Sequence, residues 1–374
     1  MAINVTQEGH ALGRAAAHGC QDHHAQEIPA RLVRDPWPAR KRARCLVHRR
    51  IRGPGEYTDY PDGSPIAAIK AGDDALKVLG SMVGAIHCVF IEEDRRRFAN
   101  LQGRLDREST NAKIRRYPIL GTFVHGMTDV RKLAGNPFDS NAPTFAFLDP
   151  FGPEGLPFAL VRELLALPGC EVLVNVDSDG IGRIYRAGGW ANHRVLLNEA
   201  FGDSSWEREL EGVAQLPVAI MKIVNLYKRK LRTLVPYAYT FEMRGRGGAF
   251  DYHLAFASQH HLGLEKMKEV MKQIDQTGAY CFSDANVNQH ILFREDDLPT
   301  YADQTARHFA GQRVSWKETN DYALNETIFT NARKVLAFLE KVGRIDVTAP
   351  NYPQRKRFTF PDESHPGMYI HFTA

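Results

Sequence analysis

Thr144-Phe145-Ala146-Phe147-Leu148-Asp149-Pro150-Phe151-Gly152 is a short apolar run that ends abruptly in an acid, a proline and a glycine. Five apolar or β-favouring residues predict a strand that is buried on both faces. Because Pro150 has no N–H to donate to a neighbouring strand, the strand has to end there. Asp149 is therefore expected at the carboxyl end of a central strand, where open α/β sheets bind their ligands. The structural alternative is an Asp-Pro turn that only closes the strand.

Strands and helices alternate on both sides of this run. Buried strands are predicted at residues 84–91, 117–123 and 171–176, and amphipathic helices at 156–167 and from Ser64 onward. This alternation predicts an α/β fold with a parallel, Rossmann-like sheet. Residues 53–283 are expected to form this domain, with a mainly helical insertion at 186–236 that covers the sheet edge.

Two further strands, 237–243 and 250–258, are joined by the glycine-rich segment 244–249. A connection this short predicts a hairpin and not a crossover. An antiparallel pair that closes an otherwise parallel sheet is typical of the class I methyltransferase fold, and it separates that fold from dehydrogenase-type Rossmann sheets.

Residues 284–374 have a different pattern. Helices are predicted at 301–309, 317–324 and 326–342, followed by two strands at 344–348 and 355–360, which together predict a winged helix. Cations on the third helix and on the second strand could contact nucleic-acid phosphates. They are Arg333, Lys334, Arg355, Lys356 and Arg357. Winged helices also dock other proteins, so a protein partner is the alternative.

The chain has 374 residues and a formal net charge of +4, and the positive charge is concentrated near the N-terminus. Residues 1–55 hold ten Lys and Arg against four acids. Residues 1–52 show neither helical nor alternating periodicity, so an irregular basic segment is expected there. It could be a nucleic-acid-binding arm.

Five scattered cysteines without a C-x-x-C pair indicate a reducing compartment, so we expect a cytoplasmic protein with no zinc site. No apolar run of about 18 residues is present, and no membrane partner is expected.

Five motifs occur in one order along the chain. They are Gly53-Pro54-Gly55-Glu56-Tyr57, Phe90-Ile91-Glu92, Leu148-Asp149-Pro150-Phe151-Gly152, Asp179-Gly180-Ile181 and Gly263-Leu264-Glu265-Lys266-Met267-Lys268. In this order the chain resembles the three-Cys-motif partner proteins (TcmP) from about residue 53 to the C-terminus. The resemblance implies a domain similar to class I S-adenosylmethionine methyltransferases, a C-terminal winged helix, and a partner with a three-cysteine motif that resembles radical-S-adenosylmethionine proteins.

The resemblance also implies a cofactor site. Gly53 and Gly55 would line the loop that approaches S-adenosylmethionine, and Glu92 would bind the ribose hydroxyls. Thr122 stands where many class I enzymes have an acid that accepts a hydrogen bond from the adenine amine, and a threonine accepts more weakly. For Glu92 the structural alternative is an acid placed before a helix because of the helix dipole.

The Asp-Pro-Phe-Gly sequence resembles the Asp/Asn-Pro-Pro-aromatic loop of methyltransferases that act on exocyclic amines. By this resemblance Asp149 would accept hydrogen bonds from the target amine, while Pro150 and Phe151 would shape the site and stack on the base. No strong base is required, because an aligned and desolvated amine attacks the methyl group directly. A purine amine, as in guanine-N2 methyltransferases of transfer RNA, is the first substrate to test.

The chain departs from the family at the first strand. Family members have Tyr-Ile-Asp-Gly-Phe-Ala-Gly-Pro-Gly, whereas residues 47–55 are Val-His-Arg-Arg-Ile-Arg-Gly-Pro-Gly, which puts Arg49 where the family has its cofactor-side acid. The codons GTA CAT CGA CGG ATT CGC GGG spell Val-His-Arg-Arg-Ile-Arg-Gly, and reading one base later gives the family sequence. The hypothesis is that residues up to about 52 are translated out of frame. Because a buried cation in a central strand is costly, no normal first strand is expected.

The sequence thus favours a methyltransferase-like protein that acts on an exocyclic amine of nucleic acid or together with its three-Cys partner, with impaired activity in this chain. The alternative is a non-catalytic protein that binds its partner or DNA through the winged helix. An NAD-dependent oxidoreductase is disfavoured by the closing hairpin and by the absence of a G-x-G-x-x-G motif after the first strand.

Overall fold

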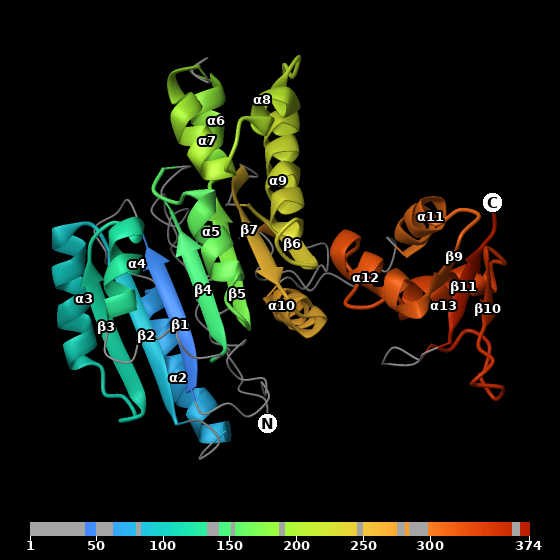
Figure 1. The fold of residues 1–374 in the computed structure, drawn as a ribbon, viewed down its shortest axis with the longest axis horizontal. Helices are drawn as coiled ribbons and strands as arrows, with labels where there is room; N and C mark the ends of the chain where they lie inside the picture. Colours follow the sequence, from blue (N-terminus) through green and yellow to red (C-terminus); the bar gives the residue numbers. More distant parts are fainter. Residues whose placement is uncertain are drawn as a thin grey trace, which may run out of the picture.

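The computed structural model describes residues 42–49, 63–79, 84–132, 142–150, 154–186, 191–244, 250–274, 281–283, 298–360 and 367–374, with 42–49 described by their backbone. Eight strands form one mixed sheet in the order β3-β2-β1-β4-β5-β7-β6-β8 (Figure 1). Their bounds are β1 Arg42–Arg49, β2 Ala85–Glu92, β3 Ile114–Leu120, β4 Thr144–Asp149, β5 Cys170–Val176, β6 Tyr237–Arg244, β7 Phe250–Ser258 and β8 Cys281–Ser283.

The first five strands are parallel, and β7 is antiparallel to both β5 and β6. The predicted α/β fold and its closing hairpin are therefore confirmed. Strand β3 ends at Leu120, three residues before the predicted end, and Phe123 begins a helix instead. Pro118 is tolerated within β3 because this strand lies at the edge of the sheet.

Strand β1 differs from the irregular segment expected over residues 1–52. Residues 42–49 form a strand in the interior of the sheet, paired with β2 on one side and with β4 on the other. A parallel ladder is made of main-chain N–H and C=O groups, so its formation does not require the apolar side chains that the sequence lacks here. The expectation that no first strand forms is wrong.

Helices cover both faces of the sheet and bury two cores. One face is covered by α4 Phe123–Lys132, α5 Phe158–Leu165, α6 Ser178–Arg186, α7 Arg194–Phe201, α8 Ser205–Leu210 and α9 Leu216–Arg232, with a 3-10 turn η2 at Ala191–His193. The other face is covered by α2 Ser64–Leu79, α3 Arg95–Arg107 and α10 His261–Ile274. The helices α6 to α8 and part of α9 extend beyond the carboxyl ends of β4 and β5 (Figure 1). Of these, α7, α8 and α9 lie within the predicted insertion, residues 186–236. No helix of the described residues is long and apolar enough to span a bilayer.

The C-terminal part forms a separate core and a three-stranded antiparallel sheet in the order β10-β11-β9. Its elements are α11 Leu298–His308, β9 Arg313–Ser315, α12 Trp316–Glu326, α13 Arg333–Lys341, β10 Ile345–Thr348 and β11 Tyr369–Phe372.

The prediction of a strand at residues 355–360 is wrong. The partner of β10 is β11, because residues 349–360 fold into successive turns that hold the Arg355 side chain against Glu340 of α13.

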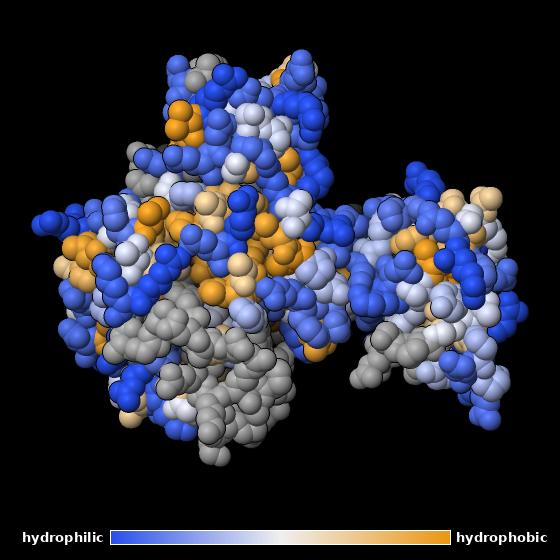
Figure 2. Space-filling view, in the orientation of Figure 1, coloured by the Kyte–Doolittle hydropathy of each residue, from blue (hydrophilic) through white to orange (hydrophobic). Residues whose placement is uncertain are grey.

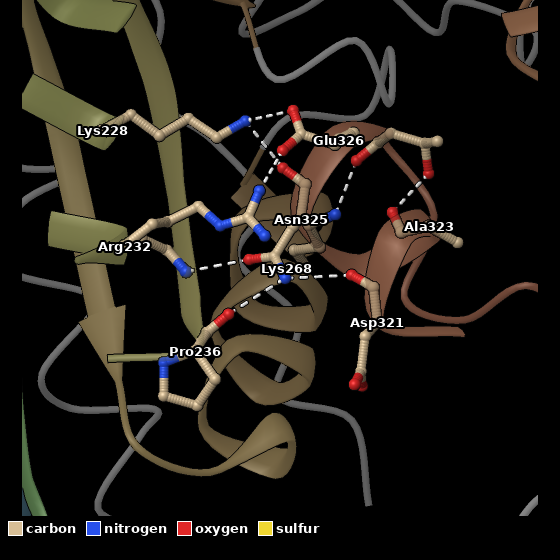
Figure 3. A network of polar contacts seen from close by, with 10 residues as sticks. Lys228, Arg232, Pro236, Lys268, Asp321, Ala323, Asn325 and Glu326 are labelled. Carbon is tan, nitrogen blue, oxygen red and sulfur yellow. Dashed lines mark hydrogen bonds and ion pairs between the residues drawn. The ribbon is translucent and has the colours of Figure 1, made fainter. Parts of the chain in front are cut away.

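Helix α12 connects this C-terminal part to the first domain through buried polar contacts (Figure 3). Lys268 of α10 is fully buried, and its Nζ donates to the carbonyl oxygens of Thr327 at 2.6 Å and Phe329 at 3.0 Å. The same Nζ lies 4.2 Å from the centre of the Tyr239 ring. Burial, with smaller effects from Lys228 and Lys272, lowers the pKa of Lys268 well below its ordinary value.

Lys228 of α9 makes the second connection. Its Nζ donates to the Asn325 carbonyl and to Glu326 Oε2, both at 2.7 Å, and Glu326 also pairs with Arg232. The Asn325 side chain accepts from the N–H of Ala238 on β6 at 3.0 Å. Because cations favour the C-terminal end of a helix, the end of α12 is a suitable place for two lysines. We call the contacts of Lys228, Lys268, Asn325 and Glu326 the α12 clamp.

Packing explains the glycine at the start of the Gly263 to Lys268 motif. A Cβ on Gly263 would lie 1.8 Å from Glu171 Oε1, so only glycine fits there. Glu171 is the second residue of β5, is buried, and accepts from Ser258 Oγ at 2.9 Å. Burial raises the pKa of Glu171 from 4.5 to about 7, against the opposing effect of the Ser258 hydrogen bond.

We expect Glu171 to make folding stability depend on pH. Between pH 4.5 and about 7 the folded protein keeps a proton that the unfolded chain loses, so stability falls as pH rises through this window. Glu171→Gln should abolish that slope and raise stability at pH 8 by roughly 3 kcal/mol. Urea unfolding followed by circular dichroism from pH 4 to 8 measures this. Glu163→Gln, an exposed carboxylate paired with Arg131, is the control. An unchanged slope in Glu171→Gln would contradict the assignment.

Lys268→Met should destabilise the protein by about 2–4 kcal/mol, because it leaves two carbonyls without their donor in a buried site. Lys266→Met is the matched control on the same helix, since Lys266 makes a surface pair with Glu269, and it should change stability by less than about 0.5 kcal/mol. Chemical denaturation at pH 7 measures both variants. Equal effects of the two substitutions would show that the α12 clamp contributes nothing specific.

Candidate functional site

The register of the sheet places four polar positions side by side at the carboxyl edge. Arg49 pairs with Asp149, and His48 pairs with Ile91, so Arg49 is level with Glu92. Leu148 pairs with Val174, so Asp149 is level with Asn175. Neighbouring positions in register share one face of a sheet. The four positions Glu92, Arg49, Asp149 and Asn175 therefore form one row on the face covered by α2 and α10, which we call the edge row.

Glu92 is held by the first turn of α3. The residue is 5% exposed, and its Oε1 accepts from the N–H of Asp94 at 2.9 Å and from Arg97 Nε at 3.2 Å. Asp94 is the N-cap of α3 and accepts from the N–H of Arg97 at 2.9 Å. The first turn of α3 therefore fixes the orientation of this carboxylate at the end of β2.

Thr122 lies close to Glu92 because the start of α4 packs tightly on β2. The N–H of Gly121 donates to the Glu92 carbonyl at 3.0 Å. Gly126 of α4 approaches Ile91 so closely that a Cβ would lie 2.6 Å from that side chain. The exposed Thr122 hydroxyl lies 2.9 Å from His125 Nδ1. The structure thus brings Glu92 and Thr122 together at the carboxyl edge of the sheet.

Asp149 ends β4 as predicted, and Pro150 after it is buried. Asn175 Nδ2 donates to Asp149 Oδ1 at 2.6 Å, which fixes the orientation of the carboxylate. The other sequence-predicted site residues of this edge, Gly53, Gly55 and Phe151, lie outside the described residues.

Asn175 is a site residue that the sequence analysis missed. Because Nδ2 has to face the Asp149 carboxylate, Oδ1 of the same amide points elsewhere. This Oδ1 is buried and has no hydrogen-bond partner within the described part of the chain, which leaves an acceptor beside Asp149. The signal in the sequence was the single amide within the apolar run Val172 to Val176. Asn175 is the sixth residue of β5, as Asp149 is the sixth residue of β4.

A second polar pair, also missed, lies on the opposite face of the sheet. Ser178 Oγ lies 2.6 Å from His253 Nδ1, and the two residues are 0% and 7% exposed. His253 pairs in register with Val176, which belongs to the core under α4 to α9. Since the Ser178 hydroxyl is fully buried, this pair fastens α6 to β7 and cannot act as a nucleophile on a substrate.

The predicted nucleic-acid cations form two separate groups. Arg333 is half-buried and Lys334 is exposed at the start of α13, whereas Arg355, Lys356 and Arg357 lie near Glu340 at the other end of this helix. Seven helical residues separate the two ends, which is about 10 Å. The five cations therefore lie toward opposite ends of α13.

Arg355 has a structural role within its group. Its Nη1 and Nη2 donate to Glu340 Oε1 at 2.9 Å and Oε2 at 2.6 Å, and the two side chains are 13% and 6% exposed. Burial opposes ionisation of Glu340, but the Arg355 guanidinium and the N–H of Phe358 outweigh it and lower the Glu340 pKa. Only Lys356 and Arg357 of this group are exposed to solvent.

Among the residues that the structure describes, no three His, Cys, Asp or Glu side chains are grouped to hold a metal ion. Among the described side chains, Glu92, Asp149, Asn175 and Thr122 are polar groups at the carboxyl edge of the sheet. Comparison with known proteins adds no name to this site: no family model and no curated protein matches the sequence.

Proposed function

We propose that the first domain is a class I methyltransferase-like domain that binds S-adenosylmethionine at the carboxyl edge of the sheet. The observation that carries the proposal is the parallel sheet closed by the antiparallel strand β7, with the edge row at the ends of its parallel strands. Ligands of open α/β sheets bind at this edge. Glu92 would bind the ribose hydroxyls and Thr122 would lie at the adenine, next to one another as described above.

The acceptor is an exocyclic amine, and a purine amine of nucleic acid is the first to test. Asp149 would accept its N–H groups, with its carboxylate oriented by Asn175 at 2.6 Å. Holding the amine in line with the methyl group, away from water, supplies the rate enhancement without a strong base. Phe151 would stack on the base, and Gly53 and Gly55 would line the cofactor loop, as the resemblance to the three-Cys-motif partner proteins implies.

A non-catalytic docking protein is the second candidate. The α12 clamp favours it, because buried contacts fix the C-terminal part, our proposed winged helix, to the first domain and so support a composite surface for a three-Cys partner or for nucleic acid. Arg49 also favours it, since its position in the edge row is where the family has an acid.

Calorimetric titration of S-adenosylhomocysteine separates the two candidates. The proteins to compare are this chain and a version in which residues 1–52 are read in the shifted frame. We expect binding by the shifted-frame version and weak or no binding by this chain, because the cation at position 49 opposes the α-ammonium group of the ligand, which an acid there would attract. If neither binds while both are folded, the methyltransferase proposal fails and the docking protein is the better account.

Glu92→Gln in the shifted-frame version should lower the affinity for S-adenosylhomocysteine about tenfold or more, because hydrogen bonds to a charged acceptor are replaced by weaker ones. Glutamine can still accept from Asp94 and Arg97, so folding should be retained. Glu93→Gln, at the next position and on the other side of the strand end, is the control and should bind normally. The same titration measures all three proteins, and equal losses in both variants would exclude a specific ribose contact.

A further inference from the structure

The loop formed by residues 349–360 is anchored to α13 and is not a wing strand. Successive turns close it, with the N–H of Tyr352, Arg355 and Thr359 donating to carbonyls three residues earlier. The bidentate pair of Arg355 with Glu340 fixes the middle of the loop, and Glu340 Oε2 also accepts from the N–H of Phe358 at 2.8 Å. The loop is therefore held in one shape by a buried ion pair.

Phe358 is the unusual residue of this loop. Its φ of 64° is the only positive φ at a non-glycine residue within the described ranges, and a bulky side chain there strains the backbone. The residue is 44% exposed, so its ring contributes little to the core. The Arg357 guanidinium lies 5.4 Å from the ring centre. Glycine or asparagine would satisfy the fold better at this position, and a strained, exposed aromatic ring is typical of a functional contact.

A cavity of about 670 Å³ lies in the same loop. The described residues that line it include the aromatic rings of Tyr352 and Phe360, the thioether of Met368 and the cation Lys356, and none of them carries a carboxylate. This volume is within the range of roughly 300–1,000 Å³ that small-molecule sites occupy. The aromatic rings and the exposed cation Lys356 suit a ligand that is both aromatic and anionic, and Arg357 and Phe358 follow Lys356 directly in the chain.

We propose that the 349–360 loop binds single-stranded nucleic acid, with a base stacked on Phe358 and phosphates held by Lys356 and Arg357. Stacking on an exposed ring needs an unstacked base, which a single strand offers and an intact duplex does not. A protein partner would instead need a broad apolar patch. On the face shown in Figure 2 the surface of residues 298–374 is mainly hydrophilic. The site lies outside the edge row and does not depend on the proposed methyl transfer.

Fluorescence anisotropy with a labelled oligo(dT) dodecamer and the full chain tests the proposal. Phe358→Gly should lower the affinity about tenfold or more through loss of stacking, while thermal stability stays equal or rises because glycine accepts the positive φ. Tyr369→Thr is the matched control: Tyr369 is 37% exposed beneath Arg313 at 4.1 Å, but it lies in β11 without strain. The control should bind as the parent does.

Lys356→Gln and Arg357→Gln should each reduce the dependence of log affinity on log salt by about 0.7. Lys341→Gln, a cation at the end of α13, should leave that dependence unchanged. Parent-like binding by Phe358→Gly, an absence of dodecamer binding by the parent chain, or tighter binding of a duplex than of the single strand would overturn the proposal. If adenosine monophosphate competes as strongly as the unlabelled dodecamer, the ligand is a free nucleotide and not a single strand, and the proposal is overturned.

Discussion

The pairing of β1 with β2 and β4 is the constraint on which the candidate site depends. Because β1 pairs with both strands, its register fixes how the ends of β2 and β4 are aligned. This alignment places Glu92 and Asp149 in one row. A slip of one residue would move a side chain to the opposite face of the sheet. Since the ladder uses main-chain groups, the register can form even where the side chains of the first strand depart from the family pattern.

The α12 clamp makes the C-terminal part an extension of the first domain. Lys268 lies in α10, yet its acceptors are carbonyls just beyond the end of α12, and Leu324 of α12 packs in the core under the sheet. Contacts between flexibly linked domains are usually exposed and polar. Here the contacts are buried instead: Lys268 is fully buried, and the Asn325 side chain accepts a hydrogen bond from the backbone of β6. Motion of the C-terminal part would have to break them, so both proposed activities are expected to act from one fixed arrangement.

Local sequence signals were sufficient for the central apolar strands and the hairpin, but not for β1 or for contacts between distant residues. The apolar run before Asp149, the glycine-rich hairpin connector and the apolar strand before Glu92 are local patterns, and each element formed where it was predicted. The strand predicted at 355–360 failed because Arg355 is held by Glu340, fifteen residues away, which no periodicity reports. Asn175 was missed for a similar reason, since its meaning comes from its neighbour Asp149 on another strand.

Arg49 is the position at which the departure from the family sequence could affect the chemistry of the proposed site. In the family pattern an acid at this position would complete a row of three carboxylates, with Glu92 on one side and Asp149 on the other. Such a row favours a cationic ligand, and both the amino group and the sulfonium of S-adenosylmethionine are positive. An arginine at position 49 instead of an acid would cancel part of that attraction in the proposed site. The backbone of β1 therefore has the register that the proposed cofactor site needs, while the side-chain sequence weakens the electrostatic preference proposed for it. This is why the shape of the fold alone does not decide between an enzyme and a docking protein.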